Sequence, residues 1–109
     1  MATTFKNIVI KNVGTKPINA VTTSAGVRAT VLGISFTNLL DSFVYVDVLI
    51  QDDTSQTGYY LKDSLLAEKT SIRVVATGER LVLAPENTLQ VRSSVDDSTD
   101  VIVSYVEIT

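Results

Sequence analysis

Residues 43–51 read FVYVDVLIQ, and apolar side chains recur in them at every second position. One side of the extended chain is entirely aliphatic, with Val44, Val46, Val48 and Ile50. The other side is mixed and still rather apolar, with Phe43, Tyr45, Asp47 and Leu49. A period of two over this length is typical of a β-strand that buries one face. The stretch therefore predicts a half-buried strand whose outer face is unusually apolar.

The same period of two runs through the rest of the chain, where β-branched and aromatic residues are dense. In residues 27–38 the alternation puts Thr30, Leu32, Ile34 and Phe36 on one face. Residues 61–69 have the only spacing compatible with a helical turn, and they are too short and too weakly capped to predict one. The strands that we expect lie at 5–12, 18–23, 27–38, 43–51, 58–61, 70–75, 80–83, 89–93 and 100–108.

Turn signals rich in Asp, Asn, Ser, Gly and Pro separate these runs, at residues 52–55, 76–78, 85–87 and 96–98. About eight or nine short strands, spaced roughly ten residues apart, predict an all-β fold, an antiparallel β-sandwich or jelly roll. No helix-length crossover supports a parallel sheet. We expect a single domain over residues 1–109, in which residues 1–16 are either the first strand or an arm that adds to a neighbour's sheet.

The charge pattern argues against several classes of partner. The net charge is −3, and the 9 Lys and Arg residues are scattered singly, which argues against a nucleic-acid site. No apolar run approaches the length of a membrane-spanning helix, and residues 1–6 lack the apolar region of a signal peptide. We therefore expect neither nucleic acid nor membrane as a partner, and a protein made and folded in a cytosol. Only 19% of residues are charged, against a usual ~25%, which hints at surface reserved for a protein partner.

The residue types that most catalysis needs are missing. The chain has no histidine and no cysteine, which removes the usual general base, the usual zinc ligand and all thiol chemistry. Neither a G-x-G-x-x-G motif nor a phosphate-binding loop is present. We expect no enzyme activity, no catalytic residue and no cofactor.

Carboxylates gather at two predicted hairpin tips. Asp52 and Asp53 lie at one tip, and Asp96, Asp97 and Asp100 lie at the other. If the two tips met, their oxygens could bind Ca²⁺, which prefers six to eight oxygen ligands. No calcium-loop pattern is present, and Asp side chains at turns accept hydrogen bonds from turn amides. We therefore expect solvated turn tips and no metal site.

The pair Tyr59 and Tyr60 follows the first acidic tip and suggests an aromatic platform for a sugar ring. Adjacent residues of a strand point to opposite faces, so only one of the two rings can serve. The other interpretation is one tyrosine directed inward and one outward, as in any strand. Sugar binding stays open as an alternative.

Residues 78–94, GERLVLAPENTLQVRSS, have the pattern of two short strands joined by a compact turn, which resembles cupins. Metal-binding cupins use this turn to direct His and Glu at an ion. Because the chain has no histidine, Glu79 and Glu86 are isolated acids and we expect the corner to be purely architectural.

The order of the short sequence motifs along the chain is informative. Residues 24–38 contain an AG…ATVxGIxxxN phrase, followed by the V-x-V-x-V strand at 44–48 and the Tyr-Tyr-Leu segment at 59–61. The runs GERLVL at 78–83, LQVRSS at 89–94 and a closing strand at 101–108 complete the series. Over roughly residues 18–109 this arrangement resembles the small virion proteins of tailed bacteriophages. These are the head decoration or cement proteins and the related tail and neck accessory sandwiches.

The resemblance implies a structural role on a virus particle, after synthesis in the cytoplasm of the bacterial host. It implies a homo-oligomer, commonly a trimer, that locks the major capsid protein or contacts other virion proteins. A tail, neck or baseplate component and a carbohydrate-binding receptor module remain alternatives. Arg28, Arg73, Arg80 and Arg92 are candidates for contacts with an acidic capsid surface, although exposed strand positions would also explain them. The candidate interface residues are Phe5, Ile8, Ile10, Leu39, Leu40, Phe43, Tyr45, Tyr59 and Tyr60.

Overall fold

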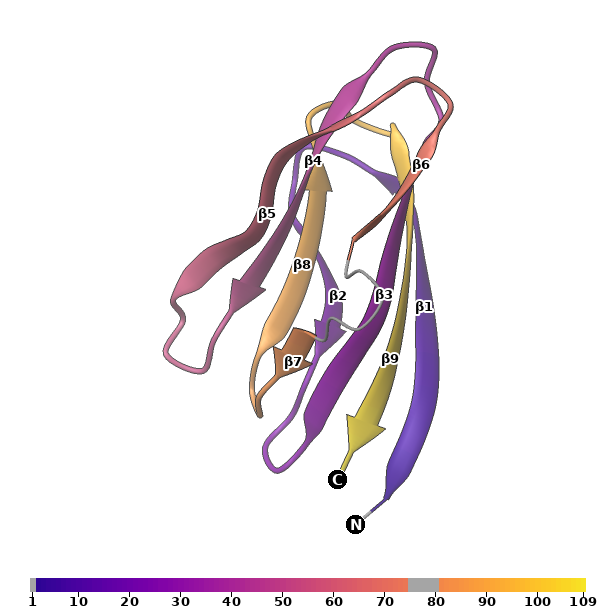
Figure 1. The fold of residues 1–109 in the computed structure, drawn as a ribbon. Helices are drawn as coiled ribbons and strands as arrows, with labels where there is room; N and C mark the ends of the chain where they lie inside the picture. Colours follow the sequence, from indigo (N-terminus) through magenta and orange to yellow (C-terminus); the bar gives the residue numbers. More distant parts are fainter. Residues whose placement is uncertain (1, 75–80) are drawn as a thin grey trace.

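Two β-sheets packed face to face make up the described part of the computed structural model, residues 2–74 and 81–109 (Figure 1). Sheet A has the strand order β1-β9-β3, with β6 and β7 both pairing with the far side of β3, and sheet B has the order β2-β8-β4-β5. All these pairings are antiparallel. The strands are β1 (Thr3–Val13), β2 (Ile18–Thr22), β3 (Arg28–Asn38), β4 (Val44–Gln51), β5 (Thr57–Leu66), β6 (Ser71–Val74), β7 (Leu81–Leu83), β8 (Thr88–Ser93) and β9 (Thr99–Ile108).

The prediction of an all-β antiparallel sandwich is confirmed, and so is each expected strand within the described residues. Residues 57–66 form β5, so the helical spacing at 61–69 does not produce a helix. No helix in the described residues is long and apolar enough to span a membrane. The turn expected at 76–78 and the residues Glu79 and Arg80 lie outside the described ranges.

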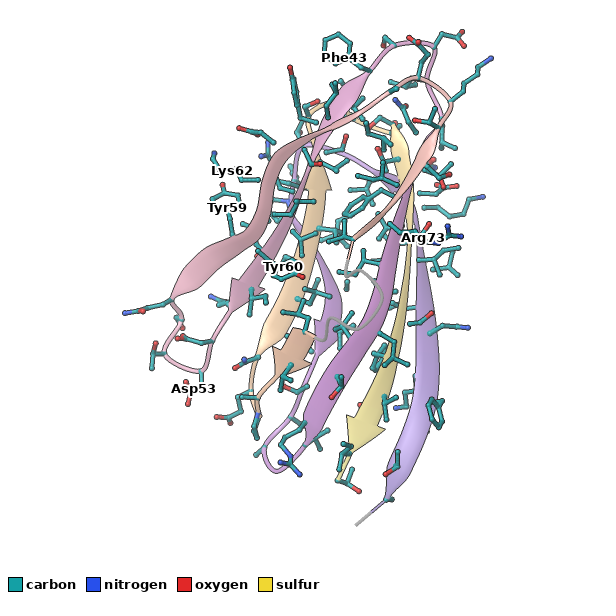
Figure 2. The ribbon with its side chains drawn as sticks, viewed as in Figure 1. Phe43, Asp53, Tyr59, Tyr60, Lys62 and Arg73 are labelled. Carbon is teal, nitrogen blue, oxygen red and sulfur yellow. The ribbon has the colours of Figure 1, made fainter. Side chains whose placement is uncertain are left out.

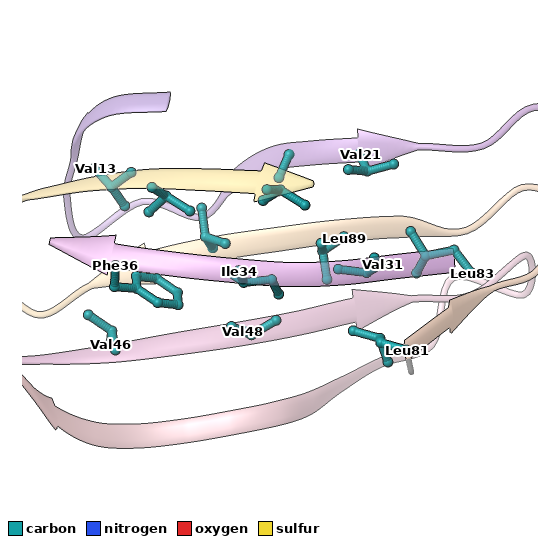
Figure 3. Packing of buried hydrophobic residues seen from close by; sticks show 14 of the residues in the cluster. Val13, Val21, Val31, Ile34, Phe36, Val46, Val48, Leu81, Leu83 and Leu89 are labelled. Atoms are coloured by element: carbon teal, nitrogen blue, oxygen red, sulfur yellow. The ribbon is translucent and has the colours of Figure 1, made fainter. Parts of the chain in front are cut away.

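The core lies between the two sheets and consists of aliphatic side chains around one aromatic ring, that of Phe36 (Figure 3). Val44, Val46 and Val48 are at most 1% exposed, as the alternation in residues 43–51 predicts. After Phe36, the largest fully buried side chains are Ile34, Leu66, Leu83 and Leu89. Burying one such aliphatic side chain contributes roughly 1.5–3 kcal/mol relative to its exposed state.

One predicted face of β3 is wrong, because this strand carries an extra residue. Val31 pairs with Tyr105 on β9, whereas Gly33 pairs with the very next residue, Ser104, so Leu32 has no partner of its own. Such a bulge reverses the alternation along the bulged strand. The buried residues are therefore odd-numbered before the bulge and even-numbered after it. Leu32, expected on the same face as Ile34 and Phe36, is 46% exposed on the outside, whereas these two residues are buried.

Two of the predicted turns carry the chain from one sheet to the other. Residues 84–87 join β7 of sheet A to β8 of sheet B, and residues 94–98 join β8 back to β9 of sheet A. The interpretation of 96–98 as a hairpin tip is therefore wrong, since β8 and β9 belong to different sheets. The turn at 52–56, which joins β4 to β5 within sheet B, is a true hairpin.

Buried Thr23 fixes the first of these corners. Its hydroxyl donates to the carbonyl of Ala84 at 2.6 Å and accepts from the amide of Asn87 at 2.9 Å. The amide of Thr23 in turn donates to the carbonyl of Asn87 at 2.9 Å. One side chain thus satisfies the polar backbone groups of a turn that lies 61 residues further along the chain. The corner at 84–87 thus has a structural role, since it connects the two sheets and is fixed by Thr23.

Candidate interaction surfaces

The outer side of sheet A carries large apolar side chains that nothing in the described chain covers. The sheet A face is defined here as five residues between 45% and 76% exposed: Phe5, Val9, Leu32, Val82 and Ile102. Cross-strand register brings them together, because Val9 pairs with Ile102 and both Phe5 and Thr30 pair with Val106. Thr30 also pairs with Val82. A shallow hollow beside Phe5 is also lined by Leu32 and Ser104.

A second group of exposed apolar side chains lies on the outer side of sheet B, near Phe43 in Figure 2. The aromatic patch is defined here as Phe43, Tyr45 and Leu65, which are 41% to 57% exposed. The rings of Phe43 and Tyr45 meet edge to face with centroids 5.7 Å apart, and Tyr45 pairs across the strands with Leu65. Edge-to-face is one of the two arrangements that aromatic rings prefer.

Buried Asn38 positions the loop that leads into the aromatic patch. Its side-chain amide nitrogen donates to the carbonyls of Ser42, Leu66 and Ala67 at 2.9 to 3.2 Å. Its side-chain oxygen accepts from the amide of Leu40 at 2.9 Å. Since every polar atom of this buried side chain is used, residues 39–43 are held against the end of β5.

The predicted interface residues do not form one surface. Phe5 belongs to the sheet A face, and Phe43 and Tyr45 lie together on the opposite sheet. Leu39 and Tyr59 are exposed at 44% and 51%. The remaining four are partly buried against the protein's own core: Ile8, Ile10, Leu40 and Tyr60.

Sequence reasoning missed several exposed apolar residues, namely Val9, Leu32, Val82, Ile102 and Leu65. Val9 carried a usable signal, because it shares the face of Phe5 in the alternation of residues 5–12. Ile102 carried none, since it stands between Val101 and Val103 in an apolar run that does not show which face is inside.

Tyr59 and Tyr60 point to opposite sides, as the strand geometry predicts (Figure 2). Tyr59 is solvent-facing and the ammonium of Lys62 lies 4.7 Å from its ring centroid. Tyr60 packs against the core. The two rings therefore form no shared platform.

The acidic turns lie at opposite ends of the sandwich (Figure 1), and one carboxylate of each accepts hydrogen bonds from nearby amides and a hydroxyl. In the turn at 52–56, Asp52 Oδ1 accepts from the backbone amide of Thr54 at 2.9 Å and from the Thr54 hydroxyl at 2.7 Å. It also accepts from the amide of Gln56 at 3.0 Å. At the other end, Asp96 Oδ1 accepts from the amide and hydroxyl of Thr15 at 2.9 and 2.8 Å. The described residues contain no group of three His, Cys, Asp or Glu side chains that could hold a metal ion.

Gly14 allows Asp96 to approach the β1–β2 loop this closely. A Cβ at position 14 would lie 2.5 Å from Asp96 Oδ1 and 2.9 Å from Asp96 Cα. Any side chain at this position would therefore push the β1–β2 loop away from the 94–98 corner.

These hydrogen bonds make the free energy of unfolding depend on pH in the acidic range. Thr15 holds the pKa of the Asp96 carboxyl below its ordinary value of 3.8, first through the backbone amide and then through the hydroxyl. The Thr54 hydroxyl and the Gln56 amide lower the pKa of Asp52 in the same way. Because the folded pKa lies below the unfolded one, the contribution is complete above about pH 4 and is lost as the pH falls through the folded pKa.

We expect the urea midpoint of unfolding to fall as the pH is lowered from about 5 to about 3. Asp96→Asn is expected to flatten this dependence, because the replaced side chain no longer titrates. Asp97→Asn is the matched control, since Asp97 has a backbone φ of 54° that asparagine also tolerates. An acid dependence in Asp96→Asn as steep as in the wild type would contradict this assignment.

The buried carboxylate of Asp47 joins three strands. Its Oδ1 accepts from the amide of Asp63 at 2.6 Å, and its Oδ2 pairs with Arg92 Nη1 at 2.5 Å. Asp63 has a φ of 50° and lies where β5 slips in register against β4. Arg92 Nε also donates to the carbonyl of Thr15 at 3.3 Å. Asp47 thus satisfies a bulge amide of β5 and anchors an arginine of β8.

The four arginines named as candidates for capsid contacts therefore differ in how exposed they are. Arg92 is engaged inside the molecule, with 30% of its side chain exposed. Arg28 and Arg73 are exposed on β3 and β6. Arg80 lies outside the described residues.

No protein-family model and no curated protein matches the sequence. Among solved structures, a chain of the Bacillus endospore appendages, described as a family of disulfide-linked pili, is similar with a TM-score of 0.58 and 7% identity. The match covers 98% of this chain and 88% of that chain. This chain has no cysteine with which to form such a link.

A chain of the infectious bursal disease virus particle is similar with a TM-score of 0.59 and 10% identity. The match covers 96% of this chain and 30% of the viral one, so this chain spans less than a third of that protein. A pentameric capsid protein from metagenomic phage sequences aligns over 94% of this chain and 59% of that chain at 17% identity. Its TM-score of 0.46 is too low to carry an argument. At these identities the likeness establishes a β-sandwich fold that viral capsid and pilus proteins also use.

Proposed function

We propose that this chain is a non-enzymatic structural protein of a virus particle, which associates with its own copies and attaches to the shell as a bacteriophage head decoration protein does. The sheet A face carries the proposal. Its five large apolar side chains are 45% to 76% exposed on one side of the sandwich. Large apolar side chains exposed together on one sheet face are a mark of a protein–protein contact.

The fold supports the proposal without defining the particle. The sandwich is shared with a chain of the infectious bursal disease virus particle, and the phrases of the sequence resemble small proteins of tailed-phage virions. In the phage proteins such sandwiches commonly form trimers, and a trimer is the oligomer that we favour. The virion is then the place where the protein acts.

The aromatic patch gives the oligomer a second surface. It lies on sheet B, opposite the sheet A face, so contacts between copies through sheet A leave it uncovered. We assign it to the major capsid protein or another virion protein. Aromatic residues are enriched in the buried centres of such interfaces, where they contribute strongly to binding.

A tail, neck or baseplate component would use the same two surfaces, so these positions remain variants of the proposal. A carbohydrate-binding module receives less support. Of the predicted pair Tyr59 and Tyr60, Tyr59 alone faces the solvent, and the ammonium of Lys62 lies 4.7 Å from its ring centroid.

Ile102→Asp is expected to break the association through sheet A. Ile102 lies on the central strand β9 beside Val9, so the new carboxylate would be buried in the contact without a partner. We expect a loss of about 2 kcal/mol or more per contact, which is at least a ~30-fold weaker association. Size-exclusion chromatography with light scattering measures the resulting mass.

Thr22→Asp is the matched control, because Thr22 is exposed on edge strand β2 of the other sheet. It adds the same charge and is expected to leave the mass unchanged. If Ile102→Asp and the control behaved alike, the sheet A face would not be the contact.

A further inference from the structure

The free edge of β1 offers a second contact of a different kind. β1 ends sheet A, and within the described residues no strand pairs with its other side (Figure 1). A long edge strand with open backbone groups is a template for another strand unless it is protected. β1 contains no proline, and of its two lysines Lys6 forms an ion pair with Glu107 at 3.1 Å.

The register with β9 shows which backbone groups are open. The amide of Thr109 donates to the carbonyl of Ala2 at 3.0 Å, so Ala2 directs its backbone groups at β9. In an antiparallel pair each residue points both groups to one side, and the side alternates along the strand. The amides and carbonyls of the odd-numbered residues between Thr3 and Lys11 therefore point to the open edge. Beyond them, Asn12 with a φ of 57° ends the regular strand.

We propose that β1 pairs antiparallel with β1 of a second copy of this chain, about a two-fold axis at Asn7. Asn7 is the midpoint of the regular stretch from Thr3 to Lys11, so this register alone uses every open group of both strands. The two copies of sheet A then form one continuous sheet. Its outer side carries both sheet A faces without interruption.

The side chains favour the same register. Phe5 lies opposite Val9 of the second copy, which is an aromatic and β-branched pair of the kind that stabilises antiparallel sheets. Lys6 lies opposite Ile8, and Lys11 lies opposite Thr3. Moving the axis one residue to Lys6 would place two lysines directly opposite each other, which is unfavourable. Moving it to Ile8 would set Phe5 against Lys11 and leave Thr3 unpaired.

This inference deepens the proposed self-association and adds a contact separate from the sheet A face. Being two-fold, the contact forms a dimer when it acts alone, and it joins subunits of two trimers when both contacts form. Its loss therefore halves the mass of a closed assembly in either case.

Single cysteines test the register directly, because the wild-type chain has none. In the Asn7→Cys variant the two Cα atoms would lie about 5.5 Å apart across a hydrogen-bonded pair. In Thr3→Cys they would lie roughly 27 Å apart, since Thr3 faces Lys11 of the other copy and each residue advances the strand by about 3.4 Å. A short bismaleimide reagent is expected to convert Asn7→Cys, and not Thr3→Cys, into a covalent dimer. Equal cross-linking of the two variants, or none, would overturn the pairing.

Asn7→Pro provides a second measurement. It removes an amide that faces the open edge, so the bonds to β9 are kept, and far-UV circular dichroism checks that the sandwich folds. We expect the light-scattering mass of the assembly to fall two-fold. If neither β1 variant behaves as expected while Ile102→Asp still lowers the mass, the strand pairing is wrong and the proposed function stands. If the wild type is monomeric with no cross-linking, both are wrong.

Discussion

Asp47→Ala is expected to lower the free energy of unfolding by about 3 kcal/mol, since it removes one partner of a buried ion pair. The substitution leaves Arg92 without its carboxylate and the Asp63 amide without its acceptor. An unsatisfied, partly buried backbone group alone costs about 1–3 kcal/mol. Arg92 is 30% exposed and can be rehydrated in part, which keeps the total near the lower end for such pairs.

Urea unfolding followed by tyrosine fluorescence measures this loss, as the chain has 4 tyrosines and no tryptophan. The protein concentration is held fixed, because self-association adds concentration-dependent stability. Asp47→Asn keeps the shape and an acceptor for Asp63, so its loss should be clearly smaller. The double variant Asp47→Leu with Arg92→Met replaces the ion pair by apolar groups and should recover the part of the loss that comes from the unpaired Arg92. The Asp63 amide stays without its acceptor in this variant, so the recovery is partial. A loss below 1 kcal/mol in Asp47→Ala would show that this carboxylate does not organise β5 and β8.

Thr23→Val is expected to destabilise the fold by about 2 kcal/mol, although the two side chains have nearly the same shape. The hydroxyl of Thr23 satisfies the carbonyl of Ala84 and the amide of Asn87, and Thr23 is only 2% exposed. With valine these backbone groups lose their partner inside the corner that takes the chain from sheet A to sheet B.

Thr23→Ser is the matched control, since it keeps the hydroxyl and removes one methyl group. It should cost about half as much or less, because only a small apolar contact is lost. The same urea titration compares the two variants. Serine as damaging as valine would mean that the methyl group, rather than the hydroxyl, supports the corner.

The sequence predicted best those features that depend on local alternation. Val44, Val46 and Val48 stand in an uninterrupted pattern and are buried as expected. Leu32 was placed on the wrong face because a single extra residue in β3 reverses the alternation. Gly33, which follows it, was a usable signal, since a glycine inside a strand often marks a bulge. The helical spacing at 61–69 has a similar cause. β5 slips in register near Asp63, which disturbs the period of two.

Features that depend on contacts between distant segments could not be predicted. The alternation placed Asp47 on an outer face, yet this residue is 2% exposed. Its partners Arg92 and Asp63 lie 45 and 16 residues away, so the local pattern could not show these contacts. For the interaction surfaces, Phe43 and Tyr45 were recognisable as outward aromatics. Of the sheet A face, only Phe5 was among the predicted interface residues. The face is assembled from four strands, and the sequence does not show their order.

The mass of the wild-type protein in solution tests the central claim most directly, and light scattering after size-exclusion chromatography measures it. One chain has a mass of 11.8 kDa. Self-association through sheet A predicts a multiple of this mass that falls when Ile102 is replaced by aspartate. A mass of one chain at every concentration, unchanged in the Ile102→Asp variant, would contradict the account.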